Sequence, residues 1–390
     1  MAALAVAVLM IGTATYLYAN SIWAHRGAGS LSDDAWSPKL AIDGYERLHI
    51  LFKTEYGFYY YVIGGDHSYT MSAGTARSSN LVVDDLEHAC FAYVLQTVAG
   101  TYAVGVYVKD SPVHVVSIAD GTDDVSPSIA VDSEGHLHVS YSAGGDLYYA
   151  TDSSGEWEVT EVLTTPPSDM DSFEWNRWQT VILVDSEDSP HIVYGIYTTE
   201  IGHVHRLPDG TWTNETIAEW DGGVPEVTAA IDSDDVIHAC YAVTDPLTSS
   251  SELVYASNAG GTWTKTSILR SDLVMGMTSL SLALRSSQEP AISFSVPGSY
   301  DLDYICMTDG RWTGAERIVK NPLTSECTLC FDSDDRPYIA YASGNGIEYA
   351  TTSVTFSERL WSALPGISLM VRVVAIPAVL IRYVSRVSEP

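Results

Sequence analysis

Seven copies of one repeat run through most of this chain, and they constrain its fold more than any other feature. The third copy begins at Pro127 and reads PSIAVDSEGHLHVSY, followed by DLYYAT and GEWEV. Each copy has an Asp at the end of a first strand, replaced once by Arg, and an aromatic residue nine positions later. The Asp or Arg positions are Asp43, Asp84, Asp132, Asp185, Asp232, Arg285 and Asp332, and the aromatic residues are Phe52, Tyr93, Tyr141, Tyr194, Tyr241, Phe294 and Tyr341. The copies are about 48 residues apart, the length of a propeller blade.

Each copy has the punctuation of four short strands. The third copy divides into SIAVD, HLHVSY, DLYYA and WEVTEV, with Asp, Gly and Ser between them. Later copies repeat the last strand as GTWTNETI, GTWTKTSI and GRWTGAERI, whereas the first two copies lack this Trp. The sequence therefore predicts an all-β fold: a seven-bladed β-propeller of four-stranded antiparallel blades over residues 33–358.

Residue size alternates along the second strand of each copy. Positions seven and nine after the Asp are mostly large, such as Ile192 and Tyr194, while positions six and eight are mostly small or His, such as Cys90 and Ala92. Both faces are nearly free of charge, as expected of strands that lie between neighbouring sheets. A large face packed on the small face of the next blade would fill the space between blades.

The stretch from Ser37 to Thr352 resembles the extracellular β-propeller repeat proteins of bacteria and archaea, whose pattern reads S-L-A-x-D-S-x-G-x-P-H-I-x-Y, then L-x-Y-A, then G-x-W. It is more distantly similar to sialidase-type propellers, whose Asp-box is present only in altered form, at residues 256–263. The resemblance implies the fold and an exported protein. Sialidases hold the carboxylate of their substrate with three arginines and have an Arg-Ile-Pro motif near the start of the propeller. Here the similar Arg206-Leu-Pro208 lies in the fourth copy, and the other arginines are few and irregularly placed, so the resemblance implies no sialidase activity.

The chain is strongly acidic, with a formal net charge of −31 and five lysines against fifty carboxylates. A surface of this sign repels phosphates, so we expect no nucleic-acid partner. Dense carboxylates are typical of proteins that stay soluble at high salt, which predicts a halophilic source. An ordinary acidic secreted protein is the alternative.

The five cysteines do not predict a disulfide framework. Cys90 and Cys240 fall in second strands and Cys306 in a third strand, where buried free thiols are expected. Cys327 and Cys330 resemble a Cys-x-x-Cys motif, but an odd separation within one strand directs the two sulfurs to opposite faces. No metal or redox site is predicted there.

Both ends of the chain are apolar. Residues 1–25 include an uncharged run that, as a helix, would extend about 33 Å and match a bilayer core of about 30 Å. We expect either a transmembrane anchor or a cleaved signal peptide there. Either one would export the repeat domain.

The C-terminal tail, residues 360–386, is interpreted as a second membrane anchor. Leu364-Pro-Gly-Ile367, an apolar run and terminal arginines resemble the archaeal PGF-CTERM sorting signal, although Ile367 replaces Phe and Arg372 interrupts the run. The alternative is a hairpin that completes the last blade. The two tails together predict an extracellular, cell-surface or membrane-anchored protein.

The seventh copy lacks the G-x-W strand, so its blade needs a strand from elsewhere. We expect closure either from residues 354–358 or from the N-terminal stretch around Trp36. Such closure would remove the exposed edges of the blade.

Histidine recurs six positions after the Asp, at His49, His138, His191 and His238. In a propeller these rings point toward neighbouring blades, which predicts core histidines with backbone or hydroxyl partners rather than a metal ring.

The turns after the Asp repeat an Asp-x-Asp or Asp-x-Glu spacing, as in Asp132-Ser-Glu134. They could offer oxygens to calcium, but each is too short to supply six ligands. We therefore predict turn chemistry and no cofactor, with calcium as the alternative.

The segment from the third to the fourth copy, TTPPSDMDSFEWNRWQT over residues 164–180, is longer than its equivalents and is the predicted recognition site. With the corresponding loop of the next copy, it supplies the predicted ligand-binding residues Asp169, Asp171, Glu174, Trp175, Arg177, Trp178, Trp220 and Asp221. Aromatic rings stack on sugar faces and carboxylates bind sugar hydroxyls. The alternative is a solvated loop whose tryptophans pack on its own blades. Asn214, in the single sequon Asn214-Glu-Thr216, is the predicted glycosylation site.

Three functions fit these features. The preferred one is a surface-anchored binding or interaction module for a surface glycan or a protein partner. The second is a carbohydrate-active enzyme, a glycoside hydrolase or lyase, that would need two of the loop carboxyl groups about 5–9 Å apart. The third is a structural component of a cell-surface assembly. No catalytic residue is assigned.

Overall fold

The computed structural model describes residues 23–27, 35–55, 57–63, 68–71, 80–84, 86–96, 101–109, 111, 114–119, 126–164, 178–196, 200–219, 226–245, 250–271, 278–296, 301–320, 322, 326–344 and 346–352. The chain divides into two units, His25–Ala350, and Met1–Ala24 together with Thr351–Pro390. Both apolar tails fall almost wholly outside the described residues. Within the described residues no helix is long and apolar enough to cross a bilayer.

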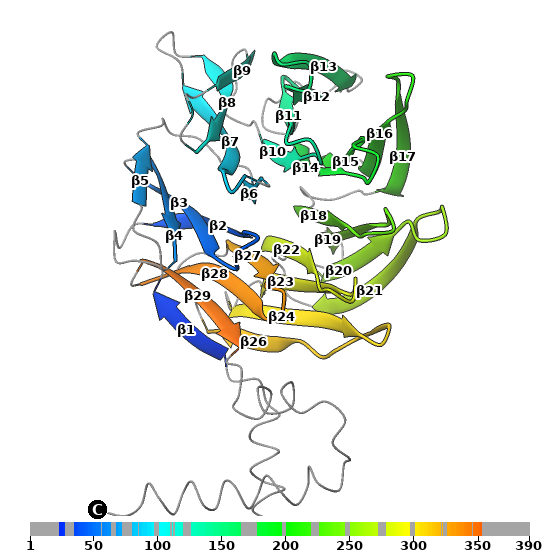
Figure 1. The fold of residues 1–390 in the computed structure, drawn as a ribbon. Helices are drawn as coiled ribbons and strands as arrows, with labels where there is room; N and C mark the ends of the chain where they lie inside the picture. The colour runs from blue at the N-terminus through cyan, green and yellow to red at the C-terminus, as the bar shows by residue number, and fades with distance from the viewer. Residues whose placement is uncertain are drawn as a thin grey trace, which may run out of the picture. The chain divides into compact units, whose positions relative to one another are not determined.

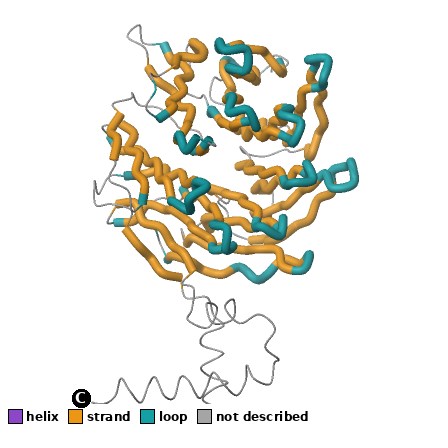
Figure 2. Tube along the Cα trace, viewed as in Figure 1, coloured by secondary structure: helices purple, strands orange, loops and turns teal. Residues whose placement is uncertain are grey.

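The described part of the chain forms seven antiparallel sheets (Figures 1 and 2). Blades 1 to 3 are β2 (Trp36–Ile42), β3 (Leu48–Thr54), β4 (Gly57–Val62) and β5 (Ser68–Met71); β6 (Val82–Val83), β7 (Ala89–Gln96), β8 (Tyr102–Val108) and β9 (His114–Ala119); and β10 (Ser128–Val131), β11 (Leu137–Ala143), β12 (Asp146–Thr151) and β13 (Glu158–Leu163). Blades 4 and 5 are β14 (Trp178–Val184), β15 (Pro190–Ile196), β16 (Glu200–Arg206) and β17 (Trp212–Glu219); and β18 (Glu226–Ile231), β19 (Ile237–Asp245), β20 (Ser250–Ser257) and β21 (Thr264–Ser271). Blade 6 is β22 (Thr278–Leu284), β23 (Pro290–Val296) and β24 (Asp301–Thr308), with β25 (Arg311–Trp312) and β26 (Glu316–Val319) both paired to β24.

The seventh blade joins the two ends of the repeat region. Its sheet order is β27 (Cys327–Phe331), β28 (Pro337–Ser343), β29 (Gly346–Thr352) and then β1 (Trp23–Gly27). The first strands of successive blades contact one another, from β2 through β6, β10, β14, β18, β22 and β27 back to β2, so they surround the centre of a closed ring. The predicted seven-bladed all-β propeller is therefore confirmed.

The strand that closes the ring differs from the one expected. Trp36 begins β2 in the first blade, and residues 354–358 lie outside the described residues. The N-terminal strand β1, upstream of both, pairs with β29. The expected kind of closure is thus present, but the strand is formed by WAHRG, a segment that carries none of the repeat's pattern.

Large faces pack on small faces as predicted, but the direction around the ring is the reverse of the predicted one, because each large face packs on the small face of the preceding blade. In one buried cluster, Val139 and Tyr141 of blade 3 lie against Cys90 and Ala92 of blade 2, and all four side chains are at most 1% exposed. The same relation holds between blades 5 and 6, and between blades 7 and 1. The face with positions six and eight therefore looks toward the next blade. Cys327 and Cys330 lie in β27 and pack in opposite directions, Cys327 toward Ser293 of blade 6 and Cys330 in the cluster shared with blade 1.

In blades 1, 3, 4 and 5, the Asp that opens the turn accepts a hydrogen bond from the histidine six positions later. Asp132 accepts backbone N–H bonds from Glu134 and His136 on Oδ1, at 3.0 and 2.8 Å, and a bond from His138 Nε2 on Oδ2, at 3.1 Å. Because His138 Nε2 donates to this carboxylate, its Nδ1 accepts from the Tyr149 hydroxyl, at 2.7 Å. Blade 1 repeats this arrangement with Asp43, His49 and Tyr60, and blade 5 repeats it with Asp232, His238 and Tyr255. These rings are core histidines as predicted, held by the repeat's own carboxylate and a tyrosine hydroxyl.

Replacing Asp43 with Asn is expected to lower the free energy of unfolding at pH 7 by about 2 kcal/mol. Burial alone would raise the pKa of Asp43, but bonds from His49, from the Arg47 backbone and side chain, and from the Tyr45 backbone outweigh it and lower the pKa to about 2. A lowered carboxylate pKa stabilises the fold above the unfolded value of 3.8, and this contribution disappears as the pH falls toward 2.

Urea unfolding of the wild type and of Asp43→Asn at pH 7, 5 and 3 measures this difference. The gap between the two proteins should shrink at pH 3. Asp234→Asn, at an exposed turn position of blade 5, is the matched control and should change stability little. A gap that stays constant with pH would contradict the prediction.

Hydrogen bonds link these turns in succession from blade 3 through blade 7 to blade 1. The residue three positions after the Asp has a left-handed backbone, for example Asp188 with φ 60° and Asp235 with φ 60°. Its side chain accepts from the turn Ser of the previous blade, as in the bonds from Ser133 N and Oγ to Asp188, at 2.9 and 2.7 Å. Similar links are Ser186 to Asp235, Ser233 to Gln288, Ser286 to Asp335 and Ser333 to Glu46. The acidic side chains of these turns thus accept hydrogen bonds from neighbouring blades, as expected of Asp and Ser in turns.

Candidate functional site

The predicted recognition residues lie outside the described part of the chain. Asp169, Asp171, Glu174, Trp175, Arg177, Trp220 and Asp221 are all outside it. Trp178 begins β14, and its backbone pairs with Ile196. These assignments therefore stay predictions.

The described strands do show where the chain enters and leaves the predicted recognition segment. β13 ends at Leu163 and β14 begins at Trp178, so residues 164–177 connect them, whereas residues 220–225 suffice between β17 and β18. The turn that follows β14 starts at Asp185, and a strand's two ends lie at opposite ends of its blade. β13 therefore ends, and β14 begins, at the end of the ring opposite to the Asp turns. The segment that connects these two strands starts and finishes at that end.

Asn214 lies on β17, the outermost strand of blade 4, and is exposed. Its Oδ1 lies 2.8 Å from the hydroxyl of Tyr194, and Glu200 Oε1 lies 2.6 Å from the same hydroxyl. The amide nitrogen, which would carry a glycan, is not the atom in this contact. The placement suits a modified side chain, and glycosylation itself stays a prediction.

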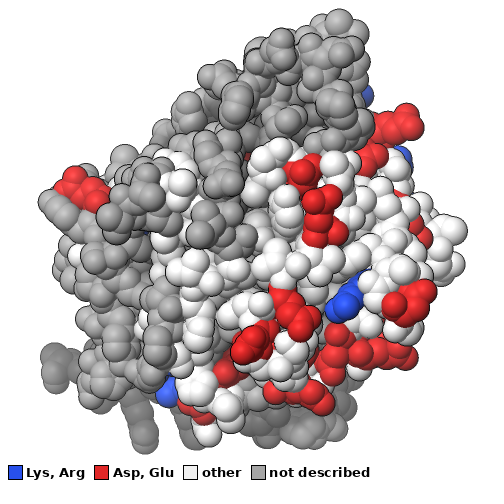
Figure 3. Space-filling model, turned by 90° about the horizontal axis from the view of Figure 1, so that it is seen from above, with Lys and Arg blue, Asp and Glu red and all other residues white. Residues whose placement is uncertain are grey.

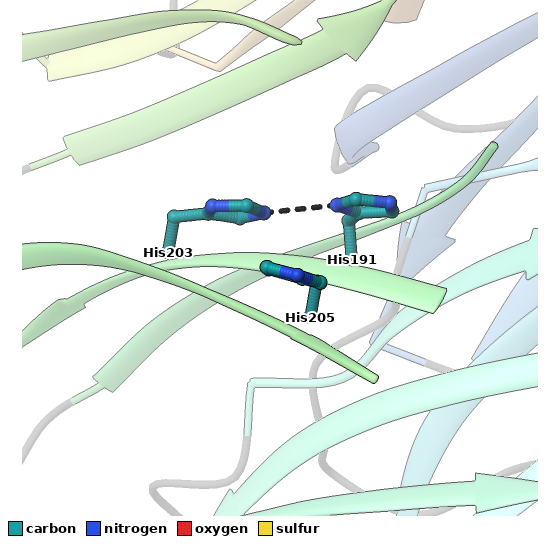
Figure 4. A group of neighbouring side chains, drawn as sticks. All are labelled: His191, His203 and His205. Carbon is teal, nitrogen blue, oxygen red and sulfur yellow. Dashed lines mark hydrogen bonds between the residues drawn. The ribbon is translucent and has the colours of Figure 1, made fainter. Parts of the chain in front are cut away.

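A cluster of three histidines in blade 4 is the clearest chemical feature of the described residues (Figure 4). His191 lies on β15, and His203 and His205 lie on β16, with His191 paired directly opposite His205. One ring nitrogen from each residue can be chosen so that all three lie within 4.8 Å of one another. His191 Nδ1 and His203 Nε2 are 3.0 Å apart, with their rings parallel to within 1°.

The cluster arises where blade 4 departs from the repeat. His191 binds Asp185 Oδ2 through Nε2 at 3.1 Å, like the corresponding histidines of blades 1, 3 and 5. The position of their tyrosine is taken by His203, which packs edge-on against Trp263 of blade 5, as Tyr149 packs against Trp212. His205 then occupies the position of Thr151 in blade 3 and Ser257 in blade 5, opposite the repeat's histidine in each case.

The surroundings of the cluster favour the neutral forms of His203 and His205. Burial, with a smaller effect from His191 and His205, lowers the pKa of His203 to about 3. Burial and His191 also lower the pKa of His205. His203 is 2% exposed, and its Nδ1 has no hydrogen-bond partner; the nearest carboxylate oxygen is Glu215 Oε2, at 3.6 Å. Neutral imidazole nitrogens in this proximity are the donor set of a transition-metal site.

Sequence reasoning considered His191 but missed His203 and His205. The signal was the His-x-His spacing in IGHVHR, because alternate residues of a strand share a face. Its meaning depends on the pairing of β15 with β16, which places His191 opposite His205.

No family model matches this chain, and no curated protein matches it. Solved structures similar to it include a catalytically inactive virginiamycin B lyase from Staphylococcus aureus with quinupristin, with a TM-score of 0.57 and 12% identity over 85% of this chain and 100% of that chain. The Aleuria aurantia lectin with α-methyl-L-fucoside has a TM-score of 0.46 and 13% identity over 70% and 89% of the two chains. The intramolecular trans-sialidase from Ruminococcus gnavus has a TM-score of 0.45 and 13% identity over 87% and 97%. At such identities the likeness concerns the propeller fold alone.

Proposed function

We propose that this chain is an exported, surface-anchored β-propeller that binds glycans through the segment between β13 and β14 and its neighbour between β17 and β18. The chain's own residues support this assignment. The observation that carries it is the contrast between the two ends of the ring.

At one end, the polar groups of the turns are used within the protein. Ser133 and Ser186 donate to Asp188 and Asp235 of the next blades, and Asp132 binds its own turn and His138. A turn whose donors and acceptors are already paired has few left for a ligand. The opposite end receives the 164–177 connection, whose sequence combines a tryptophan, carboxylates and an arginine, and which is followed directly by Trp178 of β14.

The surface charge favours a neutral ligand. Figure 3 shows far more acidic than basic side chains among the described residues of the face that it draws. Such a surface disfavours polyanions through Coulomb repulsion. Neutral sugars, by contrast, bind through aromatic stacking and hydrogen bonds to carboxylates.

We expect the full chain to bind members of a glycan array, and Trp175→Ala/Trp178→Ala to bind them about tenfold or more weakly, because each ring removed loses a stacking surface. Tyr45→Ala is the matched control, since Tyr45 is 70% exposed on a turn at the other end of the ring. Binding should be measured at high and low salt.

Binding that survives the double tryptophan substitution, or that is lost in Tyr45→Ala, would contradict the assigned segment. Absence of binding at both salt concentrations would contradict a glycan ligand and favour a protein partner.

A further inference from the structure

We propose that His191, His203 and His205 bind one transition-metal ion of the zinc, copper or nickel class, at the boundary between blades 4 and 5. Nothing in the proposed glycan recognition requires this site. It lies on the second and third strands of one blade, on the face that looks toward blade 5.

The separation of the nitrogens suits such an ion. Tetrahedral ligands at 2.0–2.1 Å from a zinc ion are about 3.4 Å apart. His191 Nδ1 and His203 Nε2 are already 3.0 Å apart, and one nitrogen can be chosen from each of the three histidines so that all three nitrogens lie within 4.8 Å of one another. Figure 4 shows the His205 ring beneath the gap between the other two rings. Small rotations of these side chains would bring the three nitrogens to one centre.

Oxygen atoms lie near ring nitrogens of all three imidazoles, and metal-binding histidines usually have such neighbours. Asp185 accepts from His191 Nε2 at 3.1 Å, which leaves the Nδ1 lone pair directed at the cluster. The Thr213 hydroxyl lies 2.8 Å from His205 Nδ1 and 3.3 Å from its Nε2. Glu215 Oε2 lies 3.6 Å from His203 Nδ1 and accepts from Trp263 Nε1 at 3.2 Å.

Metal binding requires one tautomer change and no net release of protons. In the metal-free cluster His203 Nε2–H donates to His191 Nδ1, because His191 Nε2–H donates to Asp185. On binding, His203 gives up its Nε2 proton and takes one on Nδ1, where Glu215 can accept the bond. The buried Nδ1 that lacks a hydrogen-bond partner would then gain one.

The donor set identifies the class of metal. Three imidazole ligands suit zinc, copper and nickel, whereas calcium and magnesium need oxygen ligands. Glu215 is placed behind His203, so the three protein ligands leave a fourth position for water. The ion would join β15 to β16 and stabilise the contact with Trp263.

The repeat itself supplies the variant that tests this site. His203→Tyr restores the Asp–His–Tyr arrangement of blades 1, 3 and 5, and the new ring can pack on Trp263 as Tyr255 packs on Trp312 at 5.3 Å. This variant should therefore fold. His205→Ser introduces the residue that blade 5 has at the same position.

Isothermal titration of the metal-free full chain with Zn²⁺ should give one ion per chain, with at least about tenfold weaker binding in His203→Tyr and in His205→Ser. Cobalt(II) should give the visible absorption of a tetrahedral nitrogen site without a thiolate charge-transfer band. Saturating Zn²⁺ should raise Tm in the wild type and not in His203→Tyr. His88→Asn, which removes a histidine of blade 2, is the control and should bind like the wild type.

No binding by the wild type would overturn the proposal. So would equal affinity in His203→Tyr, or a thiolate band, since either result would place the metal elsewhere.

Discussion

Replacing Gly202 with Ala is expected to lower the free energy of unfolding by about 3 kcal/mol, because the new methyl group would overlap a buried ring. A Cβ at Gly202 would lie 2.3 Å from Cζ and Oη of Tyr194. The Tyr194 ring is fully buried, and its hydroxyl is held by Glu200 and Asn214, so it cannot move aside without losing those bonds. Urea unfolding at pH 7 measures the effect.

Gly314→Ala is the matched control for this prediction. A Cβ at Gly314 would meet nothing within 4 Å, so this variant should unfold within about 0.5 kcal/mol of the wild type. The added methyl group would meet both the ring and the hydroxyl of Tyr194. The double variant Tyr194→Phe/Gly202→Ala removes the hydroxyl and keeps the ring, so its stability separates these two contributions. Equal stability of Gly202→Ala and Gly314→Ala would show that the Tyr194 ring can shift freely.

Deleting residues 1–27 is expected to destabilise the protein by at least about 3 kcal/mol and to promote association between chains. β1 supplies the outermost strand of blade 7, so its removal exposes the backbone groups of β29. It also removes the bond between His25 Nδ1 and the Tyr341 hydroxyl, at 3.0 Å. Urea unfolding and size-exclusion chromatography measure these two effects.

Deletion of residues 1–22 is the matched control, since it removes the apolar segment and keeps β1. This shorter deletion should have the same free energy of unfolding as the full chain measured in the same buffer. It should show no added association between chains. If both deletions behaved alike, the pairing of β1 with β29 would contribute nothing to stability.

The repeat was sufficient to predict the fold because each blade's signals are local. The alternation of residue size in the second strand and the Gly before Trp can be recognised within one copy. The regular copies then identify the copies that depart from the pattern. The packing of large faces on small faces also followed from parity along strands such as Leu137–Ala143. The direction around the ring did not, because parity does not determine which face looks toward the next blade. β1 could not be predicted in this way, because its partner β29 lies at the far end of the chain and WAHRG has no repeat signature.

The histidine cluster could not be predicted for a related reason. A His-x-His pair in one strand and a third histidine in the preceding strand form a site only at one register, the one in which His191 faces His205. A shift of one residue would turn both histidines of β16 to the other side of the sheet. The L-x-Y-A pattern places His203 at the position of its tyrosine, but the contact of that tyrosine's hydroxyl with the repeat's histidine is seen only in the structure.

Ring closure by β1 imposes an order on the folding of this protein during its synthesis. Residues His25 and Tyr341, which meet in blade 7, are 316 positions apart. At about 5–20 residues per second, a ribosome needs roughly 15–60 s to make the partner after β1 has been made. β1 must therefore wait unpaired while the other blades form, and its brevity and its exposed Arg26 suit that wait, because short charged strands are poor templates for wrong partners. Among the described strands, β1 is therefore made before all the others but can pair only after β29, which is made last.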